Sequence, residues 1–476
     1  MPSPVLVWFR NDLRLADHAA LGAAVATGRP VIPLYVHDDE PRDGLAPGSA
    51  SRWWLHGSLA ALDHSLRTLG SRLVVARGRP EHAIAGIARE SGATALHHHR
   101  QYGAGDVAAA ARVHNALREL GIESIEHASS LLVEPDAITT RGGTPFRVFT
   151  PFHRALTTLV QDASAMVSLP APNAISSPSR WPRSIALDEL GLQPDAARSA
   201  TLGARWNPGE AGALRALEAF AARGIGRYAA ERDHPGRNST SALSPHLRTG
   251  ELSPRQVVAR LEPHPDSSAF LREIVWREFA HHLLAHHPSM IDTPLDERFA
   301  SIEWRASDEQ LDAWRMGRTG YPIIDAGMRE LRETGWMHNR VRMLVGSFLV
   351  KDLLAPWQSG AEWFWETLVD ADAASNAMNW QWVAGCGADA APYFRIFNPV
   401  AQAERFDPDG AYVRRWVPEV AGLSDRLIHR PWTASPLELA AAGIDLGRTY
   451  PEPIVDHAEA RARALETYRR GLAMHR

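Results

Sequence analysis

The chain has 476 residues, of which 45% are hydrophobic and 22% charged, with a formal net charge of −4. This length leaves room for two or three domains, and the composition excludes a disordered or fibrous protein. The sequence has no apolar run near the ~20 residues of a membrane-spanning helix, no signal-peptide pattern and only one cysteine, so we expect a cytoplasmic protein without membrane contact, disulfide or metal site.

Residues 1–130 alternate between predicted strands and predicted helices. Leucines at helical spacing indicate a helix over 55–69, which Gly70 ends, and a second helix is expected over 104–120. Strand–helix alternation of this kind predicts a Rossmann-like α/β domain with a parallel sheet. The strands are predicted from short apolar runs at Val5–Phe9, Val31–Val36, Leu73–Ala76 and Thr94–His97.

The middle of the chain changes character. Residues 160–205 are rich in Pro, Ser and Ala, which predicts a long inter-domain linker that we place at 131–204. From 205 to 476 helical patterns dominate, which predicts an all-α C-terminal domain. Ser244 precedes Pro245 and is expected to cap a helix with its hydroxyl. Ser253 and Gln256 form the pattern of a capping box.

The stretch Asp370–Trp382, with the sequence DADAASNAMNWQW, concentrates acids, amides and indoles. On a helix Asn376 and Trp380 share a face because they are four residues apart. Trp380 and Trp382 point to roughly opposite sides, so one indole can face the protein interior and the other a ligand. The stretch suits a site that moves electrons through aromatic rings and stacks a flat group.

With this stretch, the chain resembles the family of DNA photolyases and cryptochromes. The matching motifs occur in family order from residue 5 to about residue 420, and together they are highly specific. They are Trp8–Arg14 (WFRNDLR), Thr319–Ala326 (TGYPIIDA), Gly335–Met343 (GWMHNRVRM), Asp370–Trp382 and Tyr393–Pro399 (YFRIFNP).

The resemblance implies that the helical domain binds FAD, with the reduced form active. Hydroxyls and amides of the loop before Pro245 can meet a diphosphate, helped by a helix dipole. Arg342 and Asp370 are the expected pair beside the flavin ring. Asn376 is expected to face N5, where it cannot supply an acidic proton, which favours an enzyme over a plant-type photoreceptor. The implied cofactor residues are Tyr228, Thr240, Ser241, Ala242, Leu243, Ser244, Phe270, Arg277, Arg342, Asp370, Ala371, Asp372 and Asn376.

The resemblance also implies an electron-transfer triad and a substrate pocket. Trp380, Trp357 and Trp304 match the triad that connects the surface with the flavin. Glu273 matches the residue that hydrogen-bonds the base edges of the lesion. The implied catalytic residues are Glu273, Trp276, Asn339, Met343, Asn376 and Trp382, and the implied DNA contacts are Arg232, Glu273, Trp276, Arg277, Asn339, Arg340 and Gln402.

The resemblance points to a monomeric enzyme that repairs cyclobutane pyrimidine dimers in DNA by light-driven electron transfer. Met343 stands where enzymes for the 6-4 photoproduct carry a His. A second, light-harvesting chromophore is expected in the N-terminal domain, either a folate or a deazaflavin; Gly105 lacks the amide of the usual folate contact. The alternatives are a cryptochrome-like photoreceptor, a 6-4 photolyase and a flavin- or nicotinamide-dependent oxidoreductase.

Overall fold

The computed structural model describes residues 2–39, 41, 45–128, 131–160, 167–390 and 395–473. By its internal packing the chain divides into two compact units. The first comprises residues 1–226, 241–288 and 369–374, and the second comprises 227–240, 289–368 and 375–476. The predicted domain boundaries at 130 and 204 stay a prediction.

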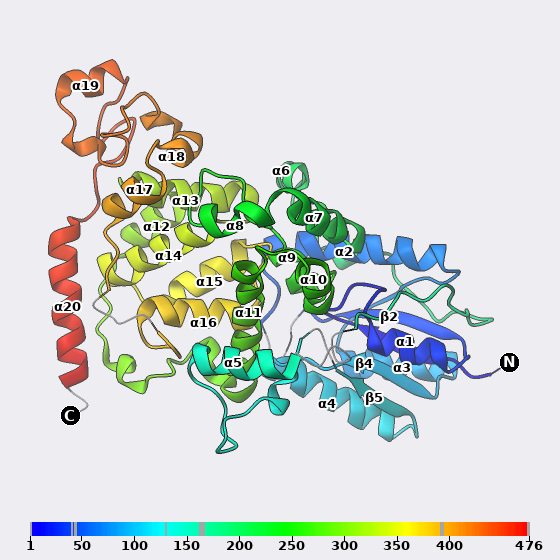
Figure 1. The fold of residues 1–476 in the computed structure, drawn as a ribbon. Coiled ribbons are helices and arrows are strands. Elements are labelled where there is room, and N and C mark those ends of the chain that lie inside the picture. Colours follow the sequence, from blue (N-terminus) through cyan, green and yellow to red (C-terminus); the bar gives the residue numbers. More distant parts are fainter. Residues whose placement is uncertain are drawn as a thin grey trace. The chain divides into compact units, whose positions relative to one another are not determined.

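The N-terminal part is a five-stranded parallel sheet in the order β3-β2-β1-β4-β5, with helices on both faces (Figure 1). Helices α1 and α2 pack on one face, and α3 and α4 on the other. The elements are β1 (Val5–Phe9), α1 (Ala19–Ala26), β2 (Val31–His37), α2 (Ser49–Thr68), β3 (Val74–Arg77), α3 (Pro80–Ser91), β4 (Ala95–His99), α4 (Ala104–Arg118) and β5 (Glu123–His127).

Four of these strands lie where the sequence predicts them, and β5 was missed. Its sequence, ESIEH, is half-buried to exposed, because β5 is an edge strand that pairs only with β4. An edge strand with this burial lacks the continuous apolar run that identified the central strands.

The described residues between 131 and 205 hold short helices and extended segments, of which residues 175–192 pack against the sheet. The Ile185 N–H donates to Val75 O at 3.0 Å, and Ile175, Leu190 and Leu192 join the core on the α1–α2 face of the sheet. The helical elements here are η1 (Pro135–Ala137), α5 (Phe149–Val160), η3 (Leu187–Leu190) and α6 (Ala196–Arg205).

The remainder of the described chain is helical. The capping box at Ser253 and Gln256 is confirmed, but the predicted cap at Ser244 is wrong: Leu243 holds the cap position without a side-chain bond, and the Ser244 hydroxyl donates to Asp370 instead. The main elements are α7 (Glu210–Arg223), α8 (Ile225–Glu231), α9 (Ser244–Thr249), α10 (Pro254–Leu261), α11 (Ser268–His286), η4 (Pro288–Ile291), η5 (Glu297–Ser301), α12 (Asp308–Met316), α13 (Pro322–Thr334), α14 (Asn339–Ser347), the π-helical turn η6 (Phe348–Asp352), α15 (Trp357–Thr367), α16 (Ala373–Ala384), α17 (Pro399–Phe406), α18 (Ala411–Trp416), η7 (Pro418–Val420), η8 (Pro431–Thr433), α19 (Pro436–Ala441) and α20 (His457–Ala473).

Candidate functional site

Within the first unit, α11 carries the predicted lesion-binding residues on one face. Glu273, Trp276 and Arg277 are all half-buried. The Trp276 indole stacks on the ring of Phe149, the first residue of α5, with ring centroids 3.5 Å apart and planes 4° from parallel. This arrangement presents a fixed flat surface next to a carboxylate.

Arg277 is tied to its own helix and to α9. Its Nη1 lies 3.4 Å from Glu278 Oε1, and its Nη2 donates to Leu247 O at 3.5 Å. Glu278 is buried and accepts a hydrogen bond from the Leu132 N–H at 2.7 Å. Burial raises the pKa of Glu278 to about 7, although Arg277 and the backbone donor lower it. Part of the Arg277 charge is therefore balanced locally when Glu278 is ionised.

The acidic segment before α16 also belongs to the first unit, where it meets α9 and α11. The Ser244 hydroxyl donates to Asp370 Oδ2 at 2.6 Å, and Arg248 Nε donates to Ala371 O at 3.0 Å. Nε2 of His281 lies 3.5 Å from Asp372 Oδ2. Four predicted cofactor residues, Ser244, Asp370, Ala371 and Asp372, therefore gather in one place. The predicted contribution of a helix dipole receives no support, since α9 has only six residues.

The loop 239–244 begins with a buried serine that is not among the implied cofactor residues. Ser239 is buried in the second unit, and its hydroxyl has no hydrogen-bond partner among the described residues. Ala242 has a φ of 52°, a left-handed conformation that turns the chain sharply. The Leu243 N–H donates to Ser241 Oγ at 3.3 Å.

Three further predicted residues flank this loop in sequence. Tyr228 is buried in the second unit, and the Arg232 guanidinium lies 5.2 Å from the centroid of its ring. Phe270 is buried in the first unit, where it packs on Phe220 with ring centroids 4.6 Å apart.

Helix α14 carries four of the predicted site residues, Asn339, Arg340, Arg342 and Met343. Asn339 is exposed, whereas Arg342 and Met343 are half-buried. Arg342 Nε donates to Met337 O at 2.8 Å. Arg340 pairs with Asp233 at 2.8 Å. This ion pair reduces the positive charge that Arg340 can offer to a phosphate.

The remaining predicted DNA contact is Gln402. It is half-buried on α17, whose first turn is capped by Asn398. Tyr393 and Phe394 of the YFRIFNP motif lie outside the described residues.

Helix α16 orients its amides and indoles through two hydrogen-bonded side chains. Asn376 Nδ2 donates to Ala361 O of α15 at 3.0 Å, which directs Oδ1 away from α15. Gln381 is buried; its Nε2 donates to the carbonyls of Met290 and Thr293, at 2.7 and 2.9 Å, and its Oε1 accepts from the Leu295 N–H. Gln381 therefore fixes the helix between the two indoles; it lies within the matched motif, but the sequence analysis assigns it no role.

The two indoles differ in exposure, as expected for residues on opposite sides of a helix: Trp380 is 4% exposed and Trp382 half-buried. The three predicted triad residues all belong to the second unit. Trp304 is half-buried, whereas Trp357 and Trp380 are buried. The Arg305 N–H donates to Leu354 O at 2.9 Å, so the backbone next to Trp304 lies beside the segment that leads to Trp357.

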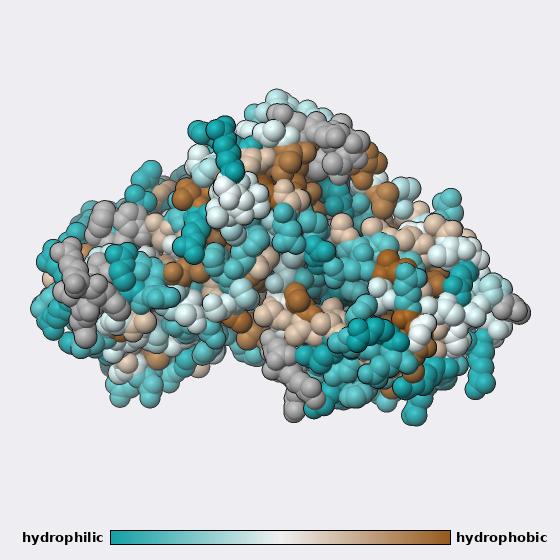
Figure 2. Space-filling model, turned by 90° about the horizontal axis from the view of Figure 1, so that it is seen from below, coloured by the Kyte–Doolittle hydropathy of each residue, from teal (hydrophilic) through white to brown (hydrophobic). Residues whose placement is uncertain are grey.

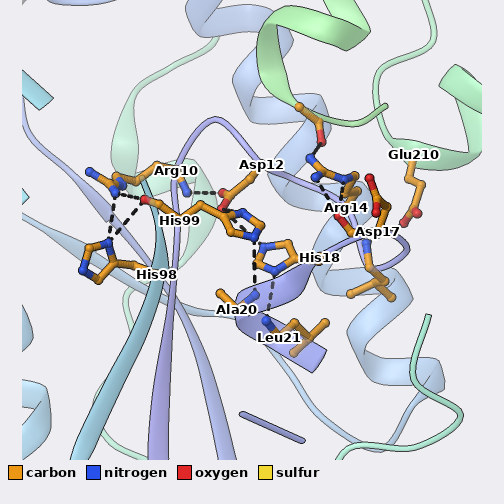
Figure 3. A network of polar contacts seen from close by, with 12 residues as sticks. Arg10, Asp12, Arg14, Asp17, His18, Ala20, Leu21, His98, His99 and Glu210 are labelled. Carbon is orange, nitrogen blue, oxygen red and sulfur yellow. Dashed lines mark hydrogen bonds and ion pairs between the residues drawn. The ribbon is translucent and has the colours of Figure 1, made fainter. Parts of the chain in front are cut away.

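The WFRNDLR motif forms a buried polar network in the first unit (Figure 3). Asp12 Oδ2 lies 2.8 Å from His99 Nδ1 and 3.3 Å from His18 Nε2. Backbone N–H groups of Leu21 and Ala20 donate to the other nitrogens of the two rings. Burial lowers the pKa of His99 to about 3, so this ring is neutral.

This network has a group of three side chains spaced like metal ligands, but its hydrogen bonding argues against a metal ion. In each of the two rings, one nitrogen already accepts a backbone N–H group through its lone pair. The other nitrogen, which faces Asp12, therefore carries a hydrogen. Burial raises the pKa of Asp12, but hydrogen bonds with His18 and His99 hold it well below its usual range. The motif is therefore structural: Arg14 also donates to Gly250 O at 2.9 Å and joins the sheet domain to the end of α9.

A pocket of about 490 Å³ opens near the carboxyl ends of β4 and β5. Its lining includes Val107 and His114 of α4, together with Tyr102, Glu126 and Asp136. Ligands of open α/β sheets bind outside the carboxyl ends of the strands.

The surface of the chain is mainly polar on the face shown in Figure 2, where hydrophobic residues form small separate groups. Among the described residues, no helix has both the length and the apolarity needed to cross a bilayer.

The chain matches two family models. Residues 5–173 match the DNA photolyase domain, and residues 270–470 match the FAD binding domain of DNA photolyase. It is 46% identical to a deoxyribodipyrimidine photo-lyase from Agrobacterium fabrum over 98% of both chains. It is 38% identical to Cryptochrome-1 from Arabidopsis thaliana over 97% of this chain and 69% of the plant protein.

A solved structure supports the same assignment. The crystal structure of a bacterial class III photolyase from Agrobacterium tumefaciens has a TM-score of 0.95 and 46% identity, covering 99% of this chain and 98% of that one. The predicted fold class, a parallel α/β domain joined to a helical FAD-binding domain, is confirmed. The chain therefore belongs to the family of DNA photolyases and cryptochromes.

Proposed function

We propose that this chain is a deoxyribodipyrimidine photo-lyase that repairs cyclobutane pyrimidine dimers in DNA under blue light. The observation that carries the proposal is the α11 face, where the stacked indole of Trp276 lies on the same face as Glu273. An indole of this kind can pack against an extruded base, and such stacking contributes roughly 1–3 kcal/mol per base. The Glu273 carboxylate accepts hydrogen bonds from the N–H groups of a pyrimidine edge.

Trp382 is the second apolar surface for the dimer, and Met343 supports the choice of lesion. A thioether holds no proton that could be transferred to a substrate, which favours cyclobutane dimers over 6-4 photoproducts. Extruding a base from the duplex costs a few kcal/mol, and less for a damaged base. Selectivity for the lesion then follows from the weaker stacking of damaged DNA and from the shape of the two aromatic walls.

The residues present fit FAD. Ser239 in the second unit has a buried hydroxyl without a hydrogen-bond partner among the described residues, and Nδ1 of His281 in the first unit is another such atom. Unpaired buried polar atoms destabilise a protein unless a ligand or water satisfies them. We propose that Tyr228, Phe270, Arg277, Arg342 and Asn376 hold the cofactor together with two segments, Thr240–Ser244 and Asp370–Asp372.

Reduced FAD, when bound, supplies the light-excited electron for ring splitting. The role of Asn376 is to accept a hydrogen bond through Oδ1, which points away from α15 because Nδ2 donates to Ala361 O. An amide cannot act as an acid, so Asn376 helps to retain the reduced state rather than protonate a partly reduced ring. Trp304, Trp357 and Trp380 relay electrons from the protein surface to the interior.

Further aspects of the proposal concern partners. Arg232, Arg277, Asn339, Arg340 and Gln402 contact the DNA, and the enzyme acts as a monomer in the cytoplasm. The N-terminal domain binds a second chromophore, a folate or a deazaflavin. The pocket beside α4 provides space for such a ring system, without distinguishing the two.

The test uses an oligonucleotide with one thymine cyclobutane dimer, the purified reduced protein, blue light and a dark control. We expect light-dependent loss of the dimer. The variant Glu273→Gln should weaken dimer binding about 10-fold or more while flavin content stays unchanged, as expected for loss of a charged hydrogen-bond acceptor. Glu262→Gln, at an exposed position of the same unit, is the matched control.

Dimer loss in the dark would instead favour an oxidoreductase. Absence of any loss with a reducible flavin present would favour a photoreceptor, or a 6-4 photolyase if a 6-4 photoproduct is repaired in its place. The similarity to Cryptochrome-1 makes the photoreceptor the second candidate.

A further inference from the structure

The stack between Phe149 and Trp276 has an unusual geometry for two aromatic side chains. Their ring centroids are 3.5 Å apart and their planes differ by 4°. Aromatic pairs prefer offset or edge-to-face arrangements over a direct face-to-face sandwich. The surrounding structure must therefore impose this geometry on the pair.

Two neighbours on α11 account for it. The ring of Phe279 meets both members nearly edge-on, with centroids 5.9 Å from each and interplanar angles of 70° and 67°. The guanidinium carbon of Arg272 lies 5.1 Å from the centroid of the Phe149 ring. Arg272 and Trp276 are one turn apart, so consecutive turns of α11 hold the same ring of α5.

The exposure of the two rings separates their roles. Phe149 is 1% exposed, so it cannot touch a substrate, whereas Trp276 is half-buried. Phe149 covers one face of the indole. Only the remaining surface of Trp276 is open to a ligand. The stacking contact with Phe149 sets the plane of the indole ring.

We propose that Phe149 is a positioning residue that fixes the plane of Trp276 for the extruded pyrimidine dimer, and so sets lesion affinity without touching DNA. The inference rests on the proposed function and adds a residue from the segment predicted as a linker. A wall held in its binding orientation before the ligand arrives loses less conformational freedom on binding. Removing the Phe149 ring should therefore weaken binding of the dimer, and not that of undamaged DNA.

The main variant is Phe149→Met, which keeps a similar volume and is among the better tolerated core changes. We expect its affinity for a dimer-containing oligonucleotide to fall about fivefold, in line with the strength of an aromatic pair. Phe149→Tyr keeps the ring and should stay within about twofold of the wild type by the same reasoning. Flavin content and the repair yield per bound complex should not change.

Phe152→Met is the matched control. Phe152 lies on the same helix with the same 1% exposure, and its ring contacts are with Phe146, Phe279 and His282. It should lose thermal stability as Phe149→Met does, while dimer affinity stays unchanged. Equal loss of affinity in both variants would overturn the proposal, because general loosening of α5 would then explain it.

A double-mutant cycle with Trp276→Ala provides the sharper test. If Phe149 acts through the indole, Phe149→Met has no further effect on dimer affinity once Trp276 is removed. Additive losses would mean that Phe149 acts by another route, and the proposal would be wrong. Light-dependent repair by the wild type is measured alongside: its absence would refute the proposed function, whereas repair with an unaffected Phe149→Met variant would refute only this inference.

Discussion

Glu278 makes the stability of the first unit depend on pH. Its carboxyl accepts a hydrogen bond from the Leu132 N–H, yet burial raises its pKa from 4.5 to about 7. Below pH 4.5 the group is protonated in both the folded and the unfolded chain. As the pH rises from 4.5 to 7 only the unfolded chain releases the proton, so this contribution to stability is progressively lost.

We expect the variant Glu278→Gln to lose no folding stability from this position as the pH rises. Between pH 5 and pH 8 the wild type should lose up to about 3 kcal/mol more folding free energy than the variant. Thermal unfolding midpoints at both pH values measure it. Because other buried acids titrate identically in both proteins, the difference between them reports Glu278 alone. Parallel pH profiles would show that the carboxyl has an ordinary pKa.

At the scale of the elements, the contact between α15 and α16 depends on a glycine. A Cβ at Gly360 would lie 2.1 Å from Trp380 Cη2 and 2.6 Å from Leu349 Cδ2, so the indole packs directly on the α15 backbone. Gly360→Ala should force Trp380 out of place and destabilise the protein by about 1–3 kcal/mol, the usual cost of overpacking. We also expect a lower yield of flavin photoreduction.

Gly86→Ala is the control for this substitution, since a Cβ at that helical position of α3 meets no atom within 4 Å. It should be neutral or stabilising, because alanine favours helix formation. A normal photoreduction yield in Gly360→Ala would mean that Trp380 need not hold this position.

The elements also show what the sequence could predict. Central strands such as Val5–Phe9 and the helix α2 follow from apolar patterns, because their burial is set by their own residues. Edge strand β5 does not, since its burial is partial. The roles of Phe149 and Gln381 were not predicted, because they come from partners more than 80 positions away, Trp276 and Met290. Motif resemblance identified candidate residues, but not the side chains that orient them.

At the scale of the whole molecule, the net charge of −4 bears on DNA binding. Long-range attraction to DNA must come from a few cations rather than from the chain as a whole. Of the three predicted arginine contacts, Arg340 already pairs with Asp233, and Arg277 lies beside Glu278. Since each neutralised phosphate contributes about −0.9 to the slope of log affinity against log salt, we expect a slope no steeper than about −3.

Measurement of dimer affinity over a range of salt concentrations, with undamaged DNA of the same length as control, tests this expectation. A markedly steeper slope would require further cations from outside the predicted set. If Arg232 contacts a phosphate, the variant Arg232→Gln should make the slope of log affinity against log salt less steep by about one unit.

The proposed electron path consists of Trp304, Trp357 and Trp380 of the second unit. Trp304 is the only half-buried member of the triad; Trp357 and Trp380 are 2% and 4% exposed. Reducing equivalents from solution must enter at the accessible end. We therefore expect Trp304→Phe, which keeps an aromatic ring but removes the readily oxidised indole, to block photoreduction of the oxidised flavin by an external donor. Repair by enzyme reduced beforehand should stay normal, because ring splitting needs no electron from the surface.

Trp363→Phe is the matched control: this indole lies on α15, is half-buried and contacts Arg315, and we assign it to packing. Absorbance of the flavin under blue light with a thiol donor follows photoreduction in all three proteins, and dimer loss follows repair. If Trp304→Phe is photoreduced at the wild-type rate while Trp363→Phe is not, the surface entry point lies on α15. If Trp304→Phe loses repair even after chemical reduction, the indole supports the fold of the site instead of electron entry.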